Sequence, residues 1–225
     1  MRNTARGAGS RQSSGPNSRI GISIDFASSM DVMGARRAFV RNTEIYGDGE
    51  PADYVYKVVN GAVRTCKLRD DGRRQVGAFY LSGDVFGLEQ RDEHNFSAEA
   101  ISYSTVLVVK RSILSRLAKR DGDIVRRLWA FTSCELKHEQ EHMLLLIKSA
   151  QERIACFLLE MAKRLATAEE VELPMSRQDI ADYLGMTIET VSRTLTGLEK
   201  VAAIGMPTSR RVILRNRAAL SRLSA

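Results

Sequence analysis

The sequence predicts an α+β protein with an amino-terminal antiparallel β-roll, a long helix and a carboxyl-terminal winged helix-turn-helix. Three observations predict this order. Short β-branched segments separated by glycine-containing turns come first, a long stretch of helical periodicity follows, and two short helices joined by a glycine lie near the end. We therefore expect four regions, at residues 1–19, 20–110, 111–149 and 150–225.

Four strand patterns define the predicted roll. They cover residues 53–61, 62–68, 75–81 and 104–109, and each is rich in β-branched or aromatic side chains. The first two are joined by Asn60-Gly61, and the second and third by Arg69-Asp-Asp-Gly72, both of which are hairpin turn signals. Short strands separated by Gly and Asp turns favour a small antiparallel barrel or roll.

Helical periodicity begins near Arg111. Residues 112–120 predict a short helix, and residues 123–149 predict a long one with apolar and polar side chains at alternating spacings of three and four. A helix this long on so small a roll predicts pairing with a second copy, and the alternative is a helix packed along its own barrel. The predicted dimerisation row is Ile124, Leu128, Phe131, Glu135, His138, His142 and Leu145.

The segment after a further helix at 151–166 predicts a helix-turn-helix. Ser176 and Asp179 form an N-cap signal for a short helix that ends at Gly185, and Thr187 caps a second helix over 188–200. A helix-turn-helix needs a small residue, a glycine in the left-handed turn and a branched residue at the crossing, and this segment supplies them at Ala181, Gly185 and Val191.

The second helix of this motif carries a candidate base-reading face. Glu189, Ser192 and Arg193 stand at i, i+3 and i+4, so their side chains point the same way. In the major groove an arginine can pair with guanine O6 and N7, and a glutamate can accept from cytosine N4. The alternative is an ordinary surface Glu–Arg pair, which the helix-turn-helix context disfavours.

Residues around the helix starts and in a following wing are candidates for contacts with the DNA backbone. Helix amino termini present N–H groups to phosphates, and residues 204–214 predict a two-stranded wing with a basic tip. The candidates for backbone contact and support are Ser176, Arg177, Gln178, Thr187, Ile188, Thr190, Ser209, Arg210 and Arg211.

The distribution of charge fits this assignment. The net charge is +7, of which residues 1–19 and residues 173–225 each hold +4, leaving −1 for the middle of the chain. A basic carboxyl-terminal module favours a polyanion such as double-stranded DNA, although solubilising surface charge would give the same balance. Residues 1–19 hold almost no apolar side chains and predict a flexible tail.

Composition excludes several other classes of protein. The chain has 225 residues, 44% hydrophobic and 27% charged, which is near the globular average. It lacks the run of about 18 apolar residues that a membrane span needs, and its first 19 residues lack the core of a signal peptide. Cys66, Cys134 and Cys156 form no disulfide framework and no CxxC metal pair. We expect a cytoplasmic protein with no membrane partner.

Residues 40–225 resemble the Crp/Fnr family of transcriptional regulators, in particular its FixK-type branch from nitrogen-fixing and denitrifying bacteria. The resemblance rests on the following motifs: Asn60-Gly61, Gly83-Asp-Val-Phe-Gly-Leu-Glu89, Ala150-Gln-Glu-Arg-Ile-Ala-Cys-Phe-Leu-Leu159 and the Fnr-like Glu189-Thr-Val-Ser-Arg193. It implies that the roll is a cyclic-nucleotide-binding-like jelly roll. It also implies a homodimer that binds an inverted repeat such as TTGA-N6-TCAA through Glu189, Ser192 and Arg193, and that activates transcription with RNA polymerase in a low-oxygen, nitrogen-fixation or denitrification circuit.

The residues depart from the ligand-binding patterns of this family. Where cyclic-nucleotide-binding relatives carry Arg-Ser/Thr-Ala, with the arginine on the cyclic phosphate, this chain has Phe96-Ser97-Ala98. A phenylalanine cannot neutralise a phosphate, so we expect no cyclic nucleotide. Iron–sulfur clusters need thiolates, and residues 1–65 contain no cysteine. The three thiols more plausibly pack as small hydrophobes than act as redox sensors, and we expect no cofactor.

Two other functions remain as alternatives. His138-Glu-Gln-Glu-His142 matches the H-E-x-x-H pattern of zinc metalloproteases. A catalytic zinc needs a third protein ligand, and the only other histidine is His94 in the roll. An RNA- or lipid-binding module is disfavoured because the chain has one Trp and no motif of stacking aromatics. We therefore expect a regulator rather than an enzyme, and no bound metal.

Overall fold

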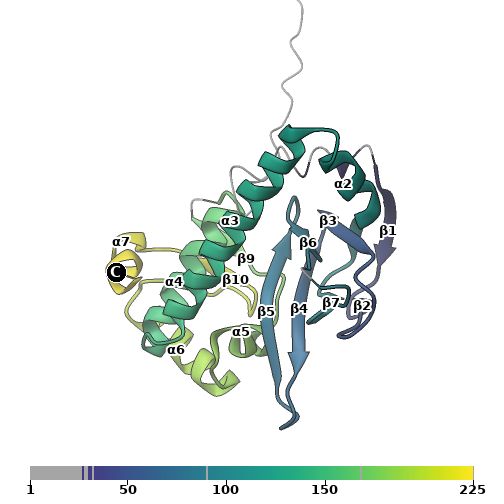
Figure 1. Cartoon of the computed structure of the whole chain (residues 1–225). Coiled ribbons are helices and arrows are strands. Elements are labelled where there is room, and N and C mark those ends of the chain that lie inside the picture. Colours follow the sequence, from purple (N-terminus) through teal and green to yellow (C-terminus); the bar gives the residue numbers. More distant parts are fainter. Residues whose placement is uncertain (1–26, 28–29, 32, 90, 168, 225) are drawn as a thin grey trace, which may run out of the picture.

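The computed structural model describes residues 27, 30–31, 33–89, 91–167 and 169–224. The predicted tail at 1–19 lies outside the described residues. A β-roll, the long helix α3 and a carboxyl-terminal helical region follow one another along the chain (Figure 1). This order is the α+β architecture that the sequence predicts.

Two four-stranded antiparallel sheets form the roll. One sheet has the order β1-β8-β3-β6 and the other β2-β7-β4-β5. The strands are β1 (Ala35–Phe39), β2 (Glu44–Tyr46), β3 (Tyr54–Asn60), β4 (Ala62–Leu68), β5 (Arg74–Leu81), β6 (Val85–Phe86), β7 (Ser97–Ala100) and β8 (Ser104–Lys110). The predicted strands correspond to β3, β4, β5 and β8. Gly61 joins β3 to β4 with φ +92°, where a Cβ would lie 2.4 Å from Ser104 Oγ, so this turn requires glycine.

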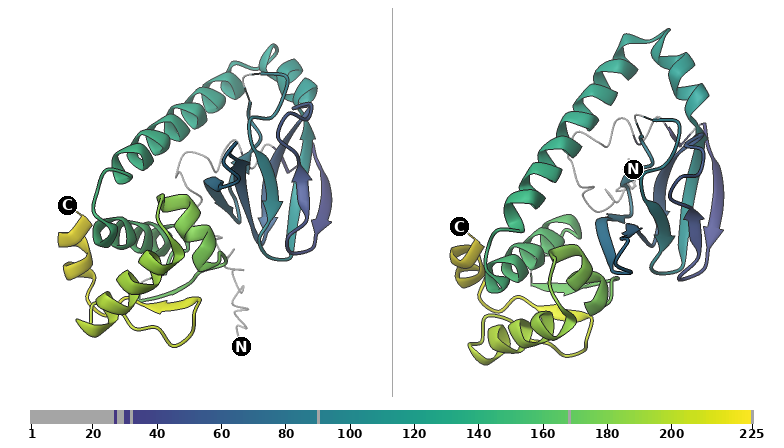
Figure 2. Two further views of the ribbon diagram at one scale, coloured as in Figure 1. Left: turned by 90° about the horizontal axis from the view of Figure 1, so that it is seen from below. Right: turned by 60° about the horizontal axis from the view of Figure 1, so that its bottom comes forward.

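Three helices connect the roll to the rest of the chain. They are α2 (Arg111–Ala118), α3 (Gly122–Leu145) and α4 (Ala150–Arg164). Asp121 caps α3 through a bond from the Asp123 N–H, and Ser149 and Glu152 form a capping box at the start of α4. Helix α3 therefore ends earlier than the predicted residue 149. Figure 2 shows it running from the roll to the carboxyl-terminal helices.

The carboxyl-terminal region contains β9 (Glu170–Glu172), α5 (Arg177–Leu184), α6 (Ile188–Lys200), β10 (Arg211–Ile213) and α7 (Arg217–Ser224). The predicted wing within residues 204–214 is wrong in one respect. Its strand β10 pairs with β9, which precedes the helix-turn-helix, and residue Gly205 contributes only an isolated bridge to Ile213. The sequence predicts no strand at Glu170 and Val171, because the alternation of side chains there is only three residues long.

One hydrophobic core runs through the roll and the carboxyl-terminal region. Phe79 of β5, Phe157 of α4 and Tyr183 of α5 form a cluster in which the ring centroids lie 5.1–6.3 Å apart. All three side chains are at most 2% exposed. The helix-turn-helix is thus packed on the roll through shared apolar contacts.

The predicted dimerisation row of α3 faces the chain's own domains. Phe131, with Leu128, packs into a cluster of the roll, and Leu145 packs into the core of the carboxyl-terminal region. His138 Nε2 lies 3.1 Å from Glu160 Oε1 of α4, and the His142 ring stacks on Tyr183 at 4.2 Å. Five members of the predicted row Ile124, Leu128, Phe131, Glu135, His138, His142 and Leu145 therefore contact the roll or the carboxyl-terminal region of the same chain, and its role in a dimer stays a prediction.

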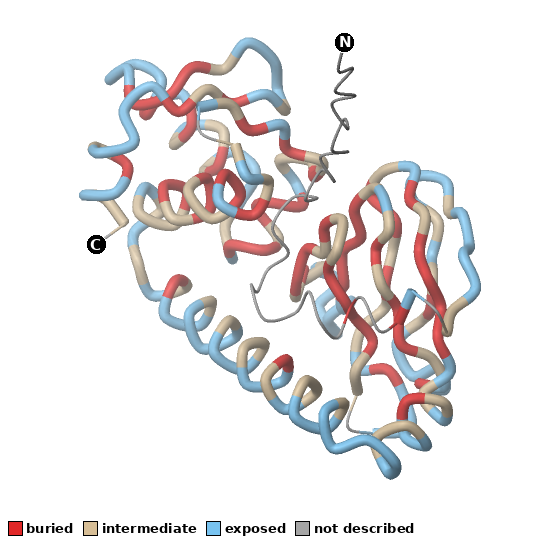
Figure 3. Tube along the Cα trace, turned by 90° about the horizontal axis from the view of Figure 1, so that it is seen from above, coloured by how far each residue is buried: buried red, intermediate tan, exposed pale blue. Residues whose placement is uncertain are grey.

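A different face of α3 is apolar and exposed. Val125, Trp129, Leu136 and Met143 are 48%, 75%, 61% and 67% exposed, and they follow one another at spacings of 4, 7 and 7. Figure 3 shows α3 as largely exposed along its length. We call these four residues the outer row of α3. Large apolar side chains gathered on one exposed face mark an interaction surface.

None of the helices in the described part of the chain combines the length and apolarity that crossing a membrane requires.

Candidate nucleic-acid interface

Helix α5 begins in the capping box that the sequence predicts. The Ser176 hydroxyl accepts from the Asp179 N–H at 3.1 Å, and Asp179 accepts from the Ser176 N–H at 2.9 Å. Such a cap stabilises a helix by about 1 kcal/mol. Because the Ser176 hydroxyl also donates to Asp179 at 2.7 Å, its role within the free chain is to hold the start of α5.

Glycine and threonine shape the turn between α5 and α6. Gly185 ends α5 with φ +63°, a left-handed conformation that glycine adopts without strain. Thr187 then caps α6 by accepting from the Thr190 N–H at 3.2 Å, and the two threonine hydroxyls lie 3.1 Å apart. The bounds of α6, Ile188–Lys200, are those that the sequence predicts.

The amino-terminal face of α6 is open to solvent. Glu189 and Arg193 are exposed, Ser192 is half-buried, and Val191 beneath them is fully buried. Hydrogen bonds from its own backbone N–H and from the Thr187 hydroxyl hold the pKa of Glu189 below its usual value. The positive charge of Arg193 adds to this effect. Glu189 is therefore ionised at neutral pH, as an acceptor for a cytosine amino group must be.

Arg177 links the two helices of the motif. Its guanidinium Nη1 donates to Ser192 Oγ at 3.3 Å, from the first turn of α5 to the exposed face of α6. Its Nε is buried and has no hydrogen-bond partner within the described chain. Gln178 is exposed beside it and donates to Asp182 at 2.6 Å. A guanidinium at the start of α5 fits contact with a phosphate through its Nη groups, not through the buried Nε.

Two arginines of the predicted wing already have partners within the chain. Arg211 forms a two-point ion pair with Glu170 of the neighbouring strand β9, and Arg210 donates to the Pro174 carbonyl at 3.3 Å. Ser209 is exposed at the tip. Arg211 must exchange one partner for another if it contacts DNA, whereas Ser209 need not.

The roll contains a cavity of about 350 Å³ at the position where the sequence places Phe96. Among the described residues that line it are the carboxylates of Glu89, Glu135 and Glu139, and no lysine or arginine. Asp84, which follows Gly83 in the motif of the roll, is 3% exposed and ion-paired with Arg164 of α4 at 2.6 Å. The lining opposes an anionic ligand because it offers acids without a compensating base.

The two histidines of the H-E-x-x-H pattern are engaged by other groups. His138 contacts Glu160, and His142 lies on Tyr183. Within the residues that the structure describes, no group of three His, Cys, Asp or Glu side chains could hold a metal ion. The metalloprotease alternative has no third ligand in this part of the chain.

The thiols of Cys66 and Cys156 are shielded. Burial raises the pKa of Cys66 to about 11, and burial also raises the pKa of Cys156. A raised pKa lowers the fraction of reactive thiolate at neutral pH. This agrees with the interpretation of these cysteines as small hydrophobic side chains.

Comparison with known proteins assigns both halves of the chain. Residues 36–121 match the model of the cyclic nucleotide-binding domain, and residues 152–223 match the Crp-like helix-turn-helix domain. The nitrogen fixation regulation protein FixK of Azorhizobium caulinodans is 53% identical over 199 residues, which cover 86% of this chain and 80% of that protein. FixK of Rhizobium meliloti is 41% identical over 170 residues, covering 75% of this chain and 77% of the relative.

A solved structure agrees with these matches. The structure of FixK2 from Bradyrhizobium japonicum superposes with a TM-score of 0.83 at 52% identity, covering 86% of this chain and 98% of that one. The fold and the exposed α6 thus define a DNA-binding transcription regulator, a class distinct from enzymes. The chain belongs to the Crp/Fnr family, in its FixK-type branch.

Two sets of contact-forming residues are not predicted from the sequence. The first is the outer row of α3, whose spacing is visible in the sequence and includes the only tryptophan. The second is the set of charged contacts between the roll and α5, which pair residues more than 100 positions apart. Spacing along the chain carries no signal for the second set.

Proposed function

We propose that this chain is a transcription activator that binds, as a homodimer, an inverted repeat of the TTGA-N6-TCAA type and recruits RNA polymerase. The observation that carries the proposal is the exposed face of α6, which presents ionised Glu189 beside Arg193 within a capped helix-turn-helix. Such a face enters the major groove with its amino-terminal residues against base edges.

The base-reading roles follow from donor and acceptor chemistry. Arg193 pairs with guanine O6 and N7, and Glu189 accepts from cytosine N4. Ser192 is held by Arg177 and completes the face. Backbone contacts come from Arg177, Gln178 and the N–H groups at the start of α6, with Thr187, Ile188 and Thr190 as support and the wing residues Ser209, Arg210 and Arg211 beyond.

The proposed dimer forms through the outer row of α3. Val125, Trp129, Leu136 and Met143 stand at heptad spacing, and their exposed side chains match the apolar seam of a two-stranded coiled coil. A second copy of α3 is the occupant that supplies the same spacing in return. Two-fold symmetry then places two recognition helices on the two halves of an inverted repeat.

DNA binding is proposed to require no cyclic nucleotide. Phe96 and the acidic lining of the cavity disfavour a phosphate. Asp84 is already ion-paired with Arg164 within the chain. The names of the FixK relatives support a role in the regulation of nitrogen fixation. Membership of the FixK-type branch supports regulation at low oxygen by a protein in the cytoplasm.

Selection of binding sites from a pool of random duplexes tests this function. The full chain, without added nucleotide, should enrich inverted repeats with TTG-containing half-sites from the pool. The Arg193→Ala variant should enrich half-sites with a relaxed guanine position. Enrichment of no sequence, or of sequences that lack two-fold symmetry, would refute the proposal.

A further inference from the structure

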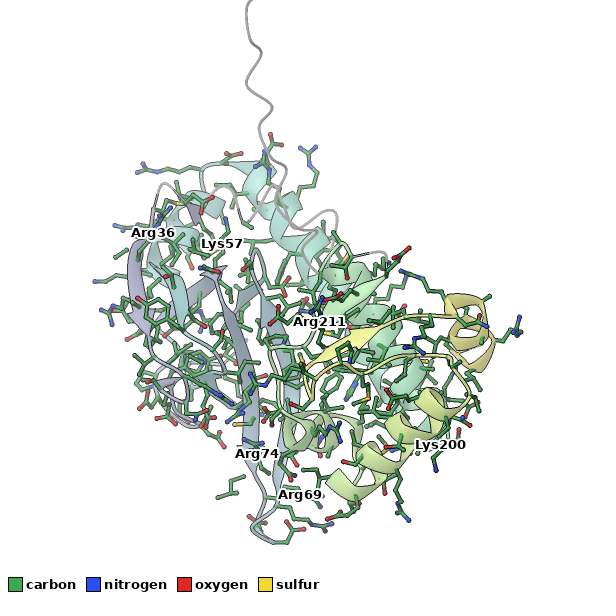
Figure 4. All side chains as sticks on the ribbon, turned by 180° about the vertical axis from the view of Figure 1, so that it is seen from behind. Arg36, Lys57, Arg69, Arg74, Lys200 and Arg211 are labelled. Carbon is green, nitrogen blue, oxygen red and sulfur yellow. The ribbon has the colours of Figure 1, made fainter. Side chains whose placement is uncertain are left out.

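Charged side chains lie beside the apolar cluster that joins the roll to α5. Arg64 of β4 donates to Asp179 at 2.5 Å, and Arg74 of β5 donates to Asp179 at 2.7 Å and to Asp182 at 2.8 Å. Gln75 adds a bond to the Asp182 carbonyl at 2.8 Å. Figure 4 shows Arg74 and Arg69 at the end of the β4–β5 hairpin that lies beside α5 and α6.

A second charged contact joins the same two regions with the opposite polarity. Here the base belongs to the DNA-binding half, because Arg164 of α4 donates to Asp84 at 2.6 Å and to the Phe79 carbonyl at 2.7 Å. The roll therefore contributes the bases to one contact and the acid to the other. If the partners were exchanged, the roll arginines would face Arg164, and Asp84 would face Asp179, so like charges would meet.

Burial makes these contacts sensitive to position. The side chains of Arg64 and Asp179 are 10% and 5% exposed, and those of Arg164 and Asp84 are 4% and 2% exposed. Buried ion pairs add little net stability because desolvation offsets their attraction, but separating one leaves an uncompensated buried charge. Such pairs select a single arrangement of the surfaces that they join. The roll and α5 are therefore held in one relative orientation.

The contact extends to the recognition helix. Asp179 is both the partner of the roll arginines and the capping-box residue of α5, so the pair acts on the first turn of that helix. From the same turn, Arg177 donates to Ser192 of α6. Glu189 and Arg193 stay exposed beside this contact.

We propose that Arg64 and Arg74 of the roll are positioning residues for DNA binding, which hold the helix-turn-helix in its binding orientation without a ligand. The inference rests on the proposed function. According to this proposal, the buried contacts to Asp179 and Asp182 hold the orientation that a bound effector would otherwise hold. The energy of orientation is already present in the free chain, so the affinity for the operator depends on these two arginines.

Arg74→Ala in the full chain tests the proposal, and Arg73→Ala is its matched control. Both remove one positive charge from the same hairpin, but within the described residues the ion-pair partner of Arg73 is the exposed Asp71. We expect Arg74→Ala to weaken binding to a TTGA-N6-TCAA duplex about 5- to 150-fold, the usual range for coupling between sites. Arg73→Ala should bind as the wild type does. Arg74→Lys should recover part of the loss, since it restores the charge without the second donor.

A double-mutant cycle distinguishes positioning from a general loss of structure. In an Asp182→Asn background, Arg74→Ala should cost less than it does in the wild type, because the partner is already neutral. The slope of affinity against salt should not change, since a residue that only positions α5 makes no contact with a phosphate. A lower melting temperature with unchanged operator affinity would overturn the proposal.

Hydrogen exchange without DNA separates this proposal from the proposed function. The amides of α5 should exchange faster in Arg74→Ala and at the wild-type rate in Arg73→Ala. If the wild type shows no preference for the operator, the proposed function fails, and exchange still decides whether Arg74 holds α5. Unchanged exchange in Arg74→Ala would overturn the positioning role.

Discussion

Helices α3 and α6 both turn one face to solvent, and the chemistry of the two faces differs. The face of α6 carries charged Glu189 and Arg193, whereas the face of α3 carries Trp129, Leu136 and Met143. A charged face at a helix amino terminus suits bases and phosphates, and an apolar face suits another apolar surface. The difference supports the proposal that α6 recognises DNA and that α3 associates with a second chain.

The largest effect is expected at the outer row of α3. Leu136→Glu places a carboxylate in the proposed dimer seam, where an unpaired buried charge is strongly disfavoured, so the dimer should dissociate at least ~100-fold more readily. Lys137→Gln is the control, because it makes the same change of charge at the next residue, which is 74% exposed and paired with Glu141. Sedimentation equilibrium measures both. A monomeric wild type, or equal behaviour of the two variants, would contradict the dimer.

The next largest effect is expected on α6. Arg193→Ala should cost about 1–3 kcal/mol per half-site and relax the preference for guanine. Arg222→Ala on α7 removes the same charge from an exposed position and serves as the control. Fluorescence anisotropy with operator and random duplexes measures the difference. Equal weakening on both duplexes would mean that Arg193 contacts the backbone and not a base.

A smaller effect is expected at Arg177, which we propose contacts the DNA backbone. Arg177→Ala should weaken all duplexes alike and reduce the salt slope by about 1 per contact. Titrations at several salt concentrations give this slope. An effect confined to the operator would instead assign Arg177 to base reading through Ser192.

The smallest effect is expected from the titration of Asp179, because this carboxylate gains a proton only at acid pH. Burial opposes its charge, but the bonds from Ser176 and the charges of Arg64 and Arg74 outweigh burial and lower its pKa. The carboxylate therefore stabilises the fold above its ordinary pKa of about 3.9, and this stability is lost as the pH falls below that value. The free energy of unfolding should depend less on pH in Asp179→Asn over this range. Identical pH profiles would show that Asp179 contributes nothing.

The comparison of α3 with α6 also shows what spacing can predict. The caps and the glycine of the helix-turn-helix act within a few residues, so Ser176, Gly185 and Thr187 could be assigned from the sequence, and the structure places them as expected. Helix α3 has two rows at heptad spacing. The choice between them depends on where α4 and the roll pack, which no local pattern records.

Long-range contacts were beyond prediction for the same reason. Strand β10 pairs with β9 across the whole helix-turn-helix, and Arg64 meets Asp179 from 115 positions away. Short strands and single charges carry no periodicity, so their partners are set only by the packed structure. The strands β3, β4, β5 and β8 can be predicted because each has at least seven residues and includes β-branched or aromatic side chains.

The most direct test of the account is the affinity of the full chain for a TTGA-N6-TCAA duplex and for a scrambled duplex, with and without cyclic AMP. We expect selective binding to the first duplex, with an affinity that the nucleotide leaves unchanged. Selectivity that appears only with cyclic AMP would contradict the role given to Phe96 and to the Asp84–Arg164 pair. Equal binding to both duplexes would contradict base reading by α6.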